Sequence, residues 1–191
     1  MTPSTAAALF ALAVVAVVVG FLVITTYNAI VAAKIRIARA WANIDVALKQ
    51  RHDQLPNLVQ AVRGIMQLEQ DVLERIAELR AAYSDRDSVP RQAATSEATS
   101  AAVRQLFAVV ENYPELRSAD NVLALQEEIS RLEDVIGDRR ELYNNQVFLY
   151  NARIAQVPAN LVSGLFGWTP APFFKTDEEE RARPEVELGR A

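Results

Sequence analysis

The chain begins with one unbroken apolar stretch. Residues 6–24 are all Ala, Val, Leu, Ile or Phe apart from Gly20, and no charged side chain occurs before Lys34. A helix needs roughly 20 apolar residues to cross the ~30 Å hydrocarbon core of a bilayer. A cleaved secretory signal is the alternative, but it would carry positive charge ahead of its apolar core, and none precedes this one. We therefore predict a transmembrane helix at 6–26, preceded by a short outer segment at 1–5.

Beyond this stretch, apolar residues recur at alternating steps of three and four, which is typical of the buried face of a helix. The first run continues the transmembrane helix and falters near Arg51. Proline suits the first turn of a helix and disrupts an ongoing one, so Pro56 predicts a break and a new helix. The second run places Glu69 among its apolar positions. The two runs consist of Ile37, Trp41, Ile44 and Leu48, and of Leu58, Val62, Ile65, Val72, Ile76, Leu79 and Tyr83.

Two further helices are predicted in the second half of the chain. The polar segment 85–102 predicts a loop that leads into a weak helix start. A shorter third helix then ends at Pro114, and a long fourth helix ends at Pro158. Four helices with short connections favour an all-α fold, in which an antiparallel up-and-down four-helix bundle at 27–158 is continuous with the transmembrane helix. The apolar positions are Val103, Leu106, Phe107 and Val110, and then Leu125, Ile129, Leu132, Ile136, Tyr143, Val147, Tyr150 and Ile154.

An even number of helices should return the chain to the membrane near residue 158. The next segment, 159–174, is aromatic and has no charged side chain, whereas 175–191 is a charged tail. Such a segment suits the headgroup layer of a bilayer. Alternatively it folds back on the bundle or fills an interface between subunits. The aromatic side chains expected at this membrane or subunit contact are Phe166, Trp168, Phe173 and Phe174.

Charge narrows the class of protein and predicts its orientation. A net charge of −4 argues against a nucleic-acid partner. The absence of cysteine excludes disulfides and thiolate metal centres, and a single histidine excludes multi-histidine metal sites. Lys34, Arg36 and Arg39 follow the apolar stretch, and cytoplasmic flanks collect such residues. We therefore expect a single-pass protein of the bacterial inner membrane, with its N-terminus outside and its bundle in the cytoplasm.

Charged residues at apolar positions of two helices predict a buried pair. Glu69 interrupts the second helix, and Arg139 or Arg140 fills the matching gap of the fourth. Burying one carboxylate alone would cost several kcal/mol, so we predict a structural ion pair that fixes the register of the helices. A metal or catalytic site is the alternative. Di-metal bundles use a Glu-x-x-His motif, which this chain lacks, and we expect no catalytic residue, metal or cofactor.

The fourth helix carries Tyr143-Asn144-Asn145 and, seven residues later, Tyr150-Asn151. Residues seven apart share one face of a helix. This face is either a contact between subunits or ordinary core packing of the tyrosines with solvated asparagines.

Several long segments resemble one known family. They are Tyr27-Asn28, AWANIDVALKQRHDQLPNLVQAVRGIMQLE at 40–69, ENYPELRSADNVLALQEEI at 111–129 and RRELYNNQVFLYNARIAQVPANLVSGLFGW at 139–168. In content and order these segments resemble the LemA family of bacterial membrane proteins. One mild departure is His52, where the family more often has tyrosine. The resemblance implies an all-α bundle behind one membrane anchor and implies no enzymatic activity.

These observations favour a non-enzymatic membrane scaffold or interaction protein of the bacterial envelope. Its expected partners are the lipid bilayer, further copies of itself as a homo-oligomer, and other envelope proteins. A membrane-remodelling factor that acts through 159–174 is an alternative. An enzyme that uses Glu69, Glu111 and Glu133 as general acid and base is a further one, which would need a pocket with converging titratable groups.

Overall fold

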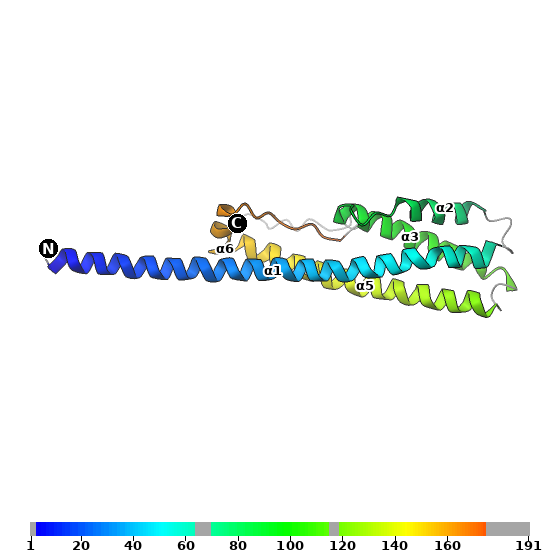
Figure 1. Cartoon of the computed structure of the whole chain (residues 1–191), viewed down its shortest axis with the longest axis horizontal. Helices are drawn as coiled ribbons and strands as arrows, with labels where there is room; N and C mark the ends of the chain where they lie inside the picture. The colour runs from blue at the N-terminus through cyan, green and yellow to red at the C-terminus, as the bar shows by residue number, and fades with distance from the viewer. Residues whose placement is uncertain (1–2, 64–69, 115–118, 175–191) are drawn as a thin grey trace, which may run out of the picture. The chain divides into compact units, whose positions relative to one another are not determined.

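The computed structural model describes residues 3–63, 70–114 and 119–174 (Figure 1). These ranges contain helices and no strand, so the predicted all-α class is confirmed. The helices are α1 (Pro3–Arg63), α2 (Gln70–Ala82), α3 (Val89–Val110), α5 (Asp120–Ala155) and α6 (Ala159–Leu165). The chain divides into two compact units. Unit 1 combines Met1–Arg39 with Asn145–Ala171, and unit 2 combines Ala40–Asn144 with Pro172–Ala191.

The break predicted at Pro56 is wrong, because α1 continues through this residue to Arg63. A proline inside a helix removes one backbone hydrogen bond and costs about 3 kcal/mol. The flanking side chains Leu55, Leu58 and Val62 are fully buried, and burying each one gains roughly 1.5–3 kcal/mol. Tertiary packing therefore outweighs the local cost of the proline.

The long polar loop predicted before the third helix is also wrong. The helix α3 begins at Val89, with Ser88 as N-cap residue and a proline in its first turn. The segment is rich in alanine, the best helix former. Its polar side chains Ser96, Thr99 and Ser100 are buried rather than solvated. Thr99 donates to the carbonyl oxygen of Thr95 within the helix, and Ser96 and Ser100 bind Arg51. The predicted fourth helix, which ends before Pro158, corresponds to α5 and is confirmed.

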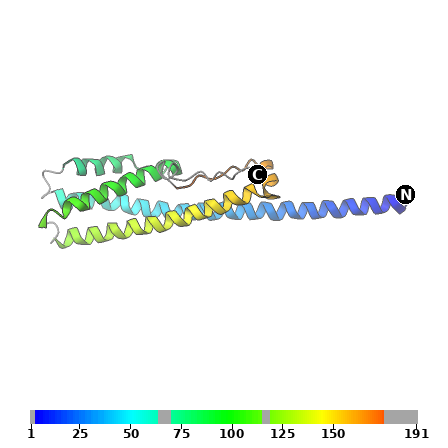
Figure 2. The ribbon, with the colours of Figure 1, turned by 180° about the vertical axis from the view of Figure 1, so that it is seen from behind.

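Unit 2 is built on a core to which four helices contribute. The helices that follow one another in the chain run in opposite directions (Figures 1 and 2). Their buried side chains form one apolar cluster, as a four-helix bundle requires. Its members are Leu55, Leu58 and Val62 from α1, Val72, Leu73, Ile76 and Leu79 from α2, Ala102, Val103, Leu106 and Val110 from α3, and Val122 and Ile129 from α5.

Unit 1 contains the apolar start of α1, the end of α5, and α6. A small core joins the three helices just beyond the apolar stretch, and its buried members are Ile30, Ala33, Tyr150, Ile154, Ala159 and Val162. The apolar stretch itself is long and apolar enough to cross a membrane. Its large side chains are uncovered, with exposed fractions from 36% at Val23 to 73% at Phe10.

Candidate functional site

The principal polar constellation of unit 2 centres on Arg51, which is only 3% exposed. Its Nη1 donates hydrogen bonds to Glu133 Oε1 and Ser100 Oγ, both at 2.8 Å. Its Nη2 donates to Ser96, at 2.9 Å to the hydroxyl and 3.3 Å to the carbonyl oxygen. Ser100 in turn donates to Glu133 Oε2. The network joins α1, α3 and α5 and compensates the buried charge of the guanidinium.

Sequence reasoning missed Arg51, although the signal was present. Ile44, Leu48, Leu55 and Leu58 follow alternating steps of four and three only if Arg51 is counted between them. The apolar pattern does not falter at Arg51, as the sequence suggests, because Arg51 itself belongs to the buried face of the helix. The structure thus contains a buried ion pair that the sequence analysis did not predict, Arg51 with Glu133.

The ion pair that the sequence predicts, between Glu69 and Arg139 or Arg140, stays a prediction. Glu69 lies outside the described residues. Arg139 and Arg140 are both half-buried on α5, and Arg140 Nη1 lies 3.7 Å from a carboxylate oxygen of Glu97 on α3.

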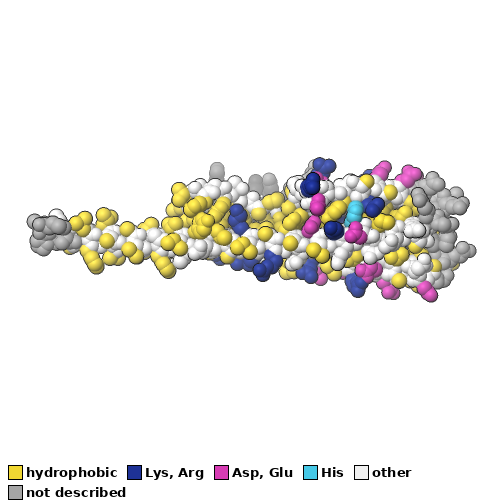
Figure 3. Space-filling view, in the orientation of Figure 1, with side chains coloured by type: hydrophobic (Ala, Val, Ile, Leu, Met, Phe, Trp, Pro, Cys, Tyr) yellow, Lys and Arg dark blue, Asp and Glu magenta, His cyan; other side chains and the backbone are white. Residues whose placement is uncertain are grey.

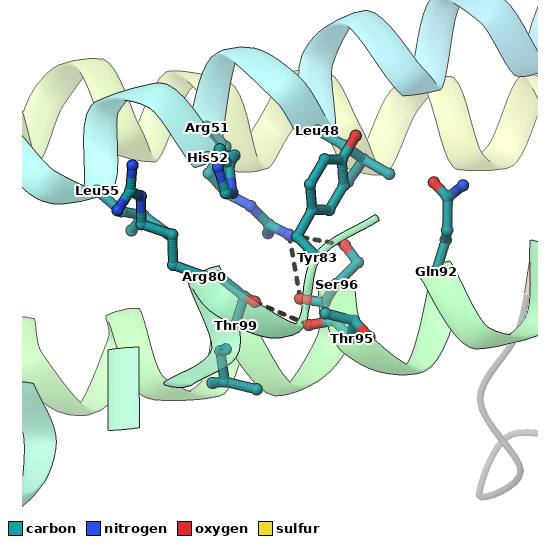
Figure 4. Close-up of a pocket in the computed structure, with 11 residues that line it drawn as sticks. Leu48, Arg51, His52, Leu55, Arg80, Tyr83, Gln92, Thr95, Ser96 and Thr99 are labelled. Carbon is teal, nitrogen blue, oxygen red and sulfur yellow. Dashed lines mark hydrogen bonds between the residues drawn. The ribbon is translucent and has the colours of Figure 1, made fainter. Parts of the chain in front are cut away.

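A small cavity of about 10 Å³ lies beside the Arg51 network (Figure 4). Gln92 lines it and is buried. Its amide nitrogen donates to the carbonyl oxygens of Asp85 and Asp87, and its Oε1 has no hydrogen-bond partner within the described ranges. A space of this size suits a single water molecule and is too small for a substrate.

The rings of Tyr83 and His52 line the same cavity in unit 2. The hydroxyl of Tyr83 donates to Asp45 Oδ1 at 3.3 Å. Burial, reinforced by the negative charge of Asp45, raises the pKa of Tyr83 to about 12. The ring of His52 lies 5.0 Å from that of Tyr83. Burial, reinforced by the positive charge of Arg80, lowers the pKa of His52. Both side chains therefore favour their neutral forms, as expected for a packed wall.

A different constellation lies in unit 1, immediately after the apolar stretch of α1. The ring of Tyr27 lies 4.9 Å from Phe166 and 5.1 Å from Trp168, between ring centroids. Phe166 and Trp168 stack at 5.4 Å. The ammonium of Lys34 lies 5.6 Å from the centre of the Trp168 ring, within the range of a cation–π contact. Phe166 and Trp168, two of the four residues predicted at a membrane or subunit contact, thus pack against Tyr27 at the end of the apolar stretch.

The other two predicted contact residues lie in unit 2. Phe174 is buried and packs with Trp41, at 6.0 Å between ring centroids. Trp41 in turn packs edge-on against Tyr143 at 5.5 Å. Phe173 is half-buried. The sequence allowed 159–174 to fold back on the bundle of its own chain, and Phe174 does so.

The expectation of solvated asparagines on α5 is wrong for Asn144 and Asn151. In unit 1, Asn151 Oδ1 accepts from the backbone N–H of Ala171 at 2.8 Å, and its Nδ2 donates to the carbonyl of Ala171 at 3.0 Å. In unit 2, Asn144 binds the N–H and carbonyl of Phe174 in the same way, at 2.8 and 3.1 Å. Each amide side chain thus imitates a neighbouring strand. We call the two arrangements the asparagine clamps.

The adjacent tyrosines bind the same segment. The hydroxyl of Tyr150 donates to the carbonyl of Thr169 at 3.1 Å in unit 1. That of Tyr143 donates to the carbonyl of Pro172 at 2.9 Å in unit 2. Burial raises the pKa of Tyr143 to about 12 and also raises that of Tyr150. Side chains seven residues apart on α5 therefore bind backbone groups three residues apart in 169–174. Tyr150 and Tyr143 bind the carbonyls of Thr169 and Pro172, and Asn151 and Asn144 bind Ala171 and Phe174.

Comparison with known proteins finds relatives that match part of the chain. Two proteins of Paramagnetospirillum magneticum, magnetosome proteins MamQ 1 and MamQ 2, are each 35% identical over 74 residues. Magnetosome protein MamQ of Magnetospirillum gryphiswaldense is 30% identical over 73 residues. These matches cover 38–39% of this chain and 27% of each relative, so the matched part is about a quarter of the relatives' length.

The family comparison covers far more of the chain. Residues 40–188 match the model of the LemA family. This range includes the Arg51 network, both asparagine clamps, and α6 with the aromatic residues that follow it. The chain therefore belongs to the LemA family.

Proposed function

We propose that this chain is a membrane-anchored, non-enzymatic scaffold of the bacterial inner membrane, with its N-terminus outside and its helical bundle in the cytoplasm. The observation that carries anchoring is the uncovered apolar stretch of α1 in unit 1. Large apolar side chains along most of a helix surface are costly in water and favourable in hydrocarbon. Lys34, Arg36 and Arg39, which follow the stretch, support the orientation.

The surface of α5 supports self-assembly. Phe148 and Leu149, in the part of α5 that belongs to unit 1, are large apolar side chains that are 49–57% exposed. Contiguous exposed apolar side chains mark contacts with partners more often than ordinary surface. The proposed partner is a second copy of the chain, and other envelope proteins are further candidates.

The polar chemistry of unit 2 supports a structural role. Glu133, one of the carboxylates considered for catalysis, accepts hydrogen bonds from Arg51 and Ser100. Glu111 is exposed at the end of α3, and Glu69 lies outside the described residues. Membership of the LemA family and the similarity to magnetosome proteins are in keeping with a role without catalysis.

Cysteine crosslinking tests the scaffold. The chain has no native cysteine, so a Leu149→Cys variant carries one thiol on the exposed face of α5. In oxidised membranes we expect a disulfide-linked dimer. The matched control is Glu78→Cys on α2, whose side chain is 68% exposed and pairs with Arg75, and it should stay monomeric. Equal crosslinking at both positions, or none at either, contradicts self-assembly through α5.

Membrane remodelling through 159–174 remains the second candidate function. It is favoured by α6 and its flanks, where Val157, Leu161 and Leu165 are 70–78% exposed. Wedging apolar side chains into one leaflet bends a bilayer. Vesicles reconstituted with the full chain should then be smaller than vesicles with a Leu161→Ser/Leu165→Ser variant, as measured by electron cryo-microscopy. Equal vesicle sizes would count against this function.

A further inference from the structure

The charges of the chain are divided unevenly between the two units. Residues 1–39 and 145–171, which make up unit 1, contain four basic side chains and no Asp or Glu. All 24 acidic residues therefore belong to unit 2, in a chain whose net charge is −4. On the face shown in Figure 3, the apolar stretch of α1 carries no magenta side chain. The four basic residues are Lys34, Arg36, Arg39 and Arg153.

These basic side chains are exposed and lie just beyond the apolar stretch. In α1, Lys34 is ten residues past Ile24, or about 15 Å along the helix axis. Long basic side chains extend several ångströms back along a helix toward a membrane surface while their stems stay on apolar surface. Lys34 also contacts the Trp168 ring, so the cationic and aromatic groups lie at one level of unit 1.

At the same level, unit 1 exposes apolar side chains. The helix α6 packs against α1 through Ala159 and Val162, and this leaves its opposite side uncovered. Leu161 and Leu165 of α6 are 70–78% exposed. Val157, just before α6, is 78% exposed, and Phe166, just after it, is 49% exposed although it contacts Tyr27. Contacts of Tyr27 with Phe166 and Trp168 fix this surface within a few residues of the end of the apolar stretch.

We infer that this part of unit 1 is a binding surface for anionic phospholipid headgroups. The inference deepens the proposed function, because it rests on α1 crossing the bilayer. The exposed side chains of α6, with Phe166 and Trp168, enter the boundary between headgroups and acyl chains. The four basic residues bind the phosphates of the same leaflet. Interfacial helices combine apolar insertion with basic residues in this way.

Charge complementarity favours lipid over a second copy of the chain at this surface. In a symmetric dimer through this surface, each copy would present the same four cations to the other and no carboxylate from unit 1. Juxtaposed like charges oppose association. An anionic leaflet offers opposite charge, and the surface is continuous with the segment that crosses the bilayer.

The test uses the fluorescence of Trp168. The chain has two tryptophans, and Trp41→Phe leaves Trp168 as the only reporter. This variant is reconstituted in phosphatidylcholine vesicles with one-tenth phosphatidylglycerol, and bromine is placed on either lipid, because bromine quenches tryptophan on contact. We expect contact quenching by both lipids, with phosphatidylglycerol enriched around Trp168 by about fivefold or more, which is the effect of one basic residue at such a surface. The same measurement on Trp168→Phe, in which Trp41 reports, gives the background.

Charge removal supplies the matched control. Arg36→Gln/Arg39→Gln/Arg153→Gln should lower the enrichment while contact with lipid persists, because Lys34 alone then remains of the four basic residues of unit 1. Arg75→Gln/Arg104→Gln/Arg131→Gln removes the same charge from side chains of unit 2 that are 58–70% exposed, and it should leave the enrichment unchanged. Circular dichroism confirms that each variant is helical.

Three results would overturn the inference. They are quenching by the two lipids in proportion to their bulk mole fractions, quenching by aqueous acrylamide alone, and protection from both that grows with the protein-to-lipid ratio, which would place a second copy on the surface. Vesicle flotation in the same samples keeps the two proposals apart. A chain that floats with vesicles while Trp168 is in water contradicts only the headgroup surface, whereas a chain that does not float contradicts the membrane anchor.

Discussion

The guanidinium of Arg51 and the carboxylate of Glu133 lie 2.8 Å apart, although 82 residues separate them in the sequence. The side chain of Arg51 is 4% exposed and that of Glu133 is 25% exposed. The pair therefore joins α1 to α5 in a largely dry setting. Such a pair gives modest net stability compared with apolar residues, but removing one partner leaves a buried charge without compensation.

We expect Glu133→Ala to lower the free energy of unfolding by about 3 kcal/mol, because Arg51 would lose its counterion inside the core. Replacing both residues, as Arg51→Met/Glu133→Leu, should recover most of that loss. Glu141→Ala, an exposed position on the same helix, should stay within about 0.5 kcal/mol of the wild type. Denaturant unfolding in detergent measures all three. A neutral Glu133→Ala would show that the pair is dispensable.

The asparagine clamps predict local effects on hydrogen exchange. Asn151→Ala removes both bonds to Ala171, and a hydrogen bond contributes about 1 kcal/mol. The amide of Ala171 should then exchange at least roughly fivefold faster. Asn144→Ala should do the same for Phe174. Asn145→Ala, at the exposed position between them, is the control. Unchanged exchange at Ala171 in Asn151→Ala would contradict the clamp.

Stability should fall in alkali through two tyrosines. In the folded chain the pKa values of Tyr83 and Tyr143 are about 12, above their usual value of 10.0. A group whose pKa is raised by folding stabilises the fold fully below its unfolded pKa. That contribution is lost as the pH rises from 10 toward 12. Tyr83→Phe/Tyr143→Phe should therefore lose less stability between pH 9 and pH 11.5 than the wild type does, as measured by unfolding in guanidinium. Equal losses would contradict the assignment.

Orientation is tested by thiol labelling in intact cells. Ser88 is exposed just before α3, on the side of the bilayer that Lys34, Arg36 and Arg39 predict to be cytoplasmic. A Ser88→Cys variant should resist a membrane-impermeant reagent until the cells are opened. Ser4→Cys, ahead of the apolar stretch, should label in intact cells. The reverse pattern would place the bundle outside.

The periodicity of the sequence predicted where the helices lie better than it predicted where they begin and end. Periodicity located α5 and the face that it buries, because Ile129, Ile136 and Val147 recur on one face over about five turns. It failed at Pro56, where a local rule about proline competed with the burial of Leu55 and Leu58. Whether a helix continues through a proline depends on packing between distant segments, and one local stretch of sequence does not contain that information.

The polar sites were harder to predict than the apolar core. Arg51 stands in step with the apolar positions around it, but its partners Ser96 and Ser100 lie in a stretch whose composition is typical of a loop. The asparagine clamps left even less signal. Their seven-residue spacing was visible, whereas the segment that they bind shows no periodicity and has no regular structure in 168–173.

The asparagine clamps set a rule for which mutations the segment at 169–174 tolerates. The amide and phenol groups of α5 recognise carbonyls and N–H groups that nearly every amino acid supplies. Proline alone lacks the N–H, and the two prolines of the segment stand at 170 and 172, not at the donating positions 171 and 174. At Ala171, therefore, the clamp forbids proline but places no demand of its own on the side chain. What limits the side chains there is packing, since Ala171 lies against the core of unit 1 and Phe174 is buried in unit 2.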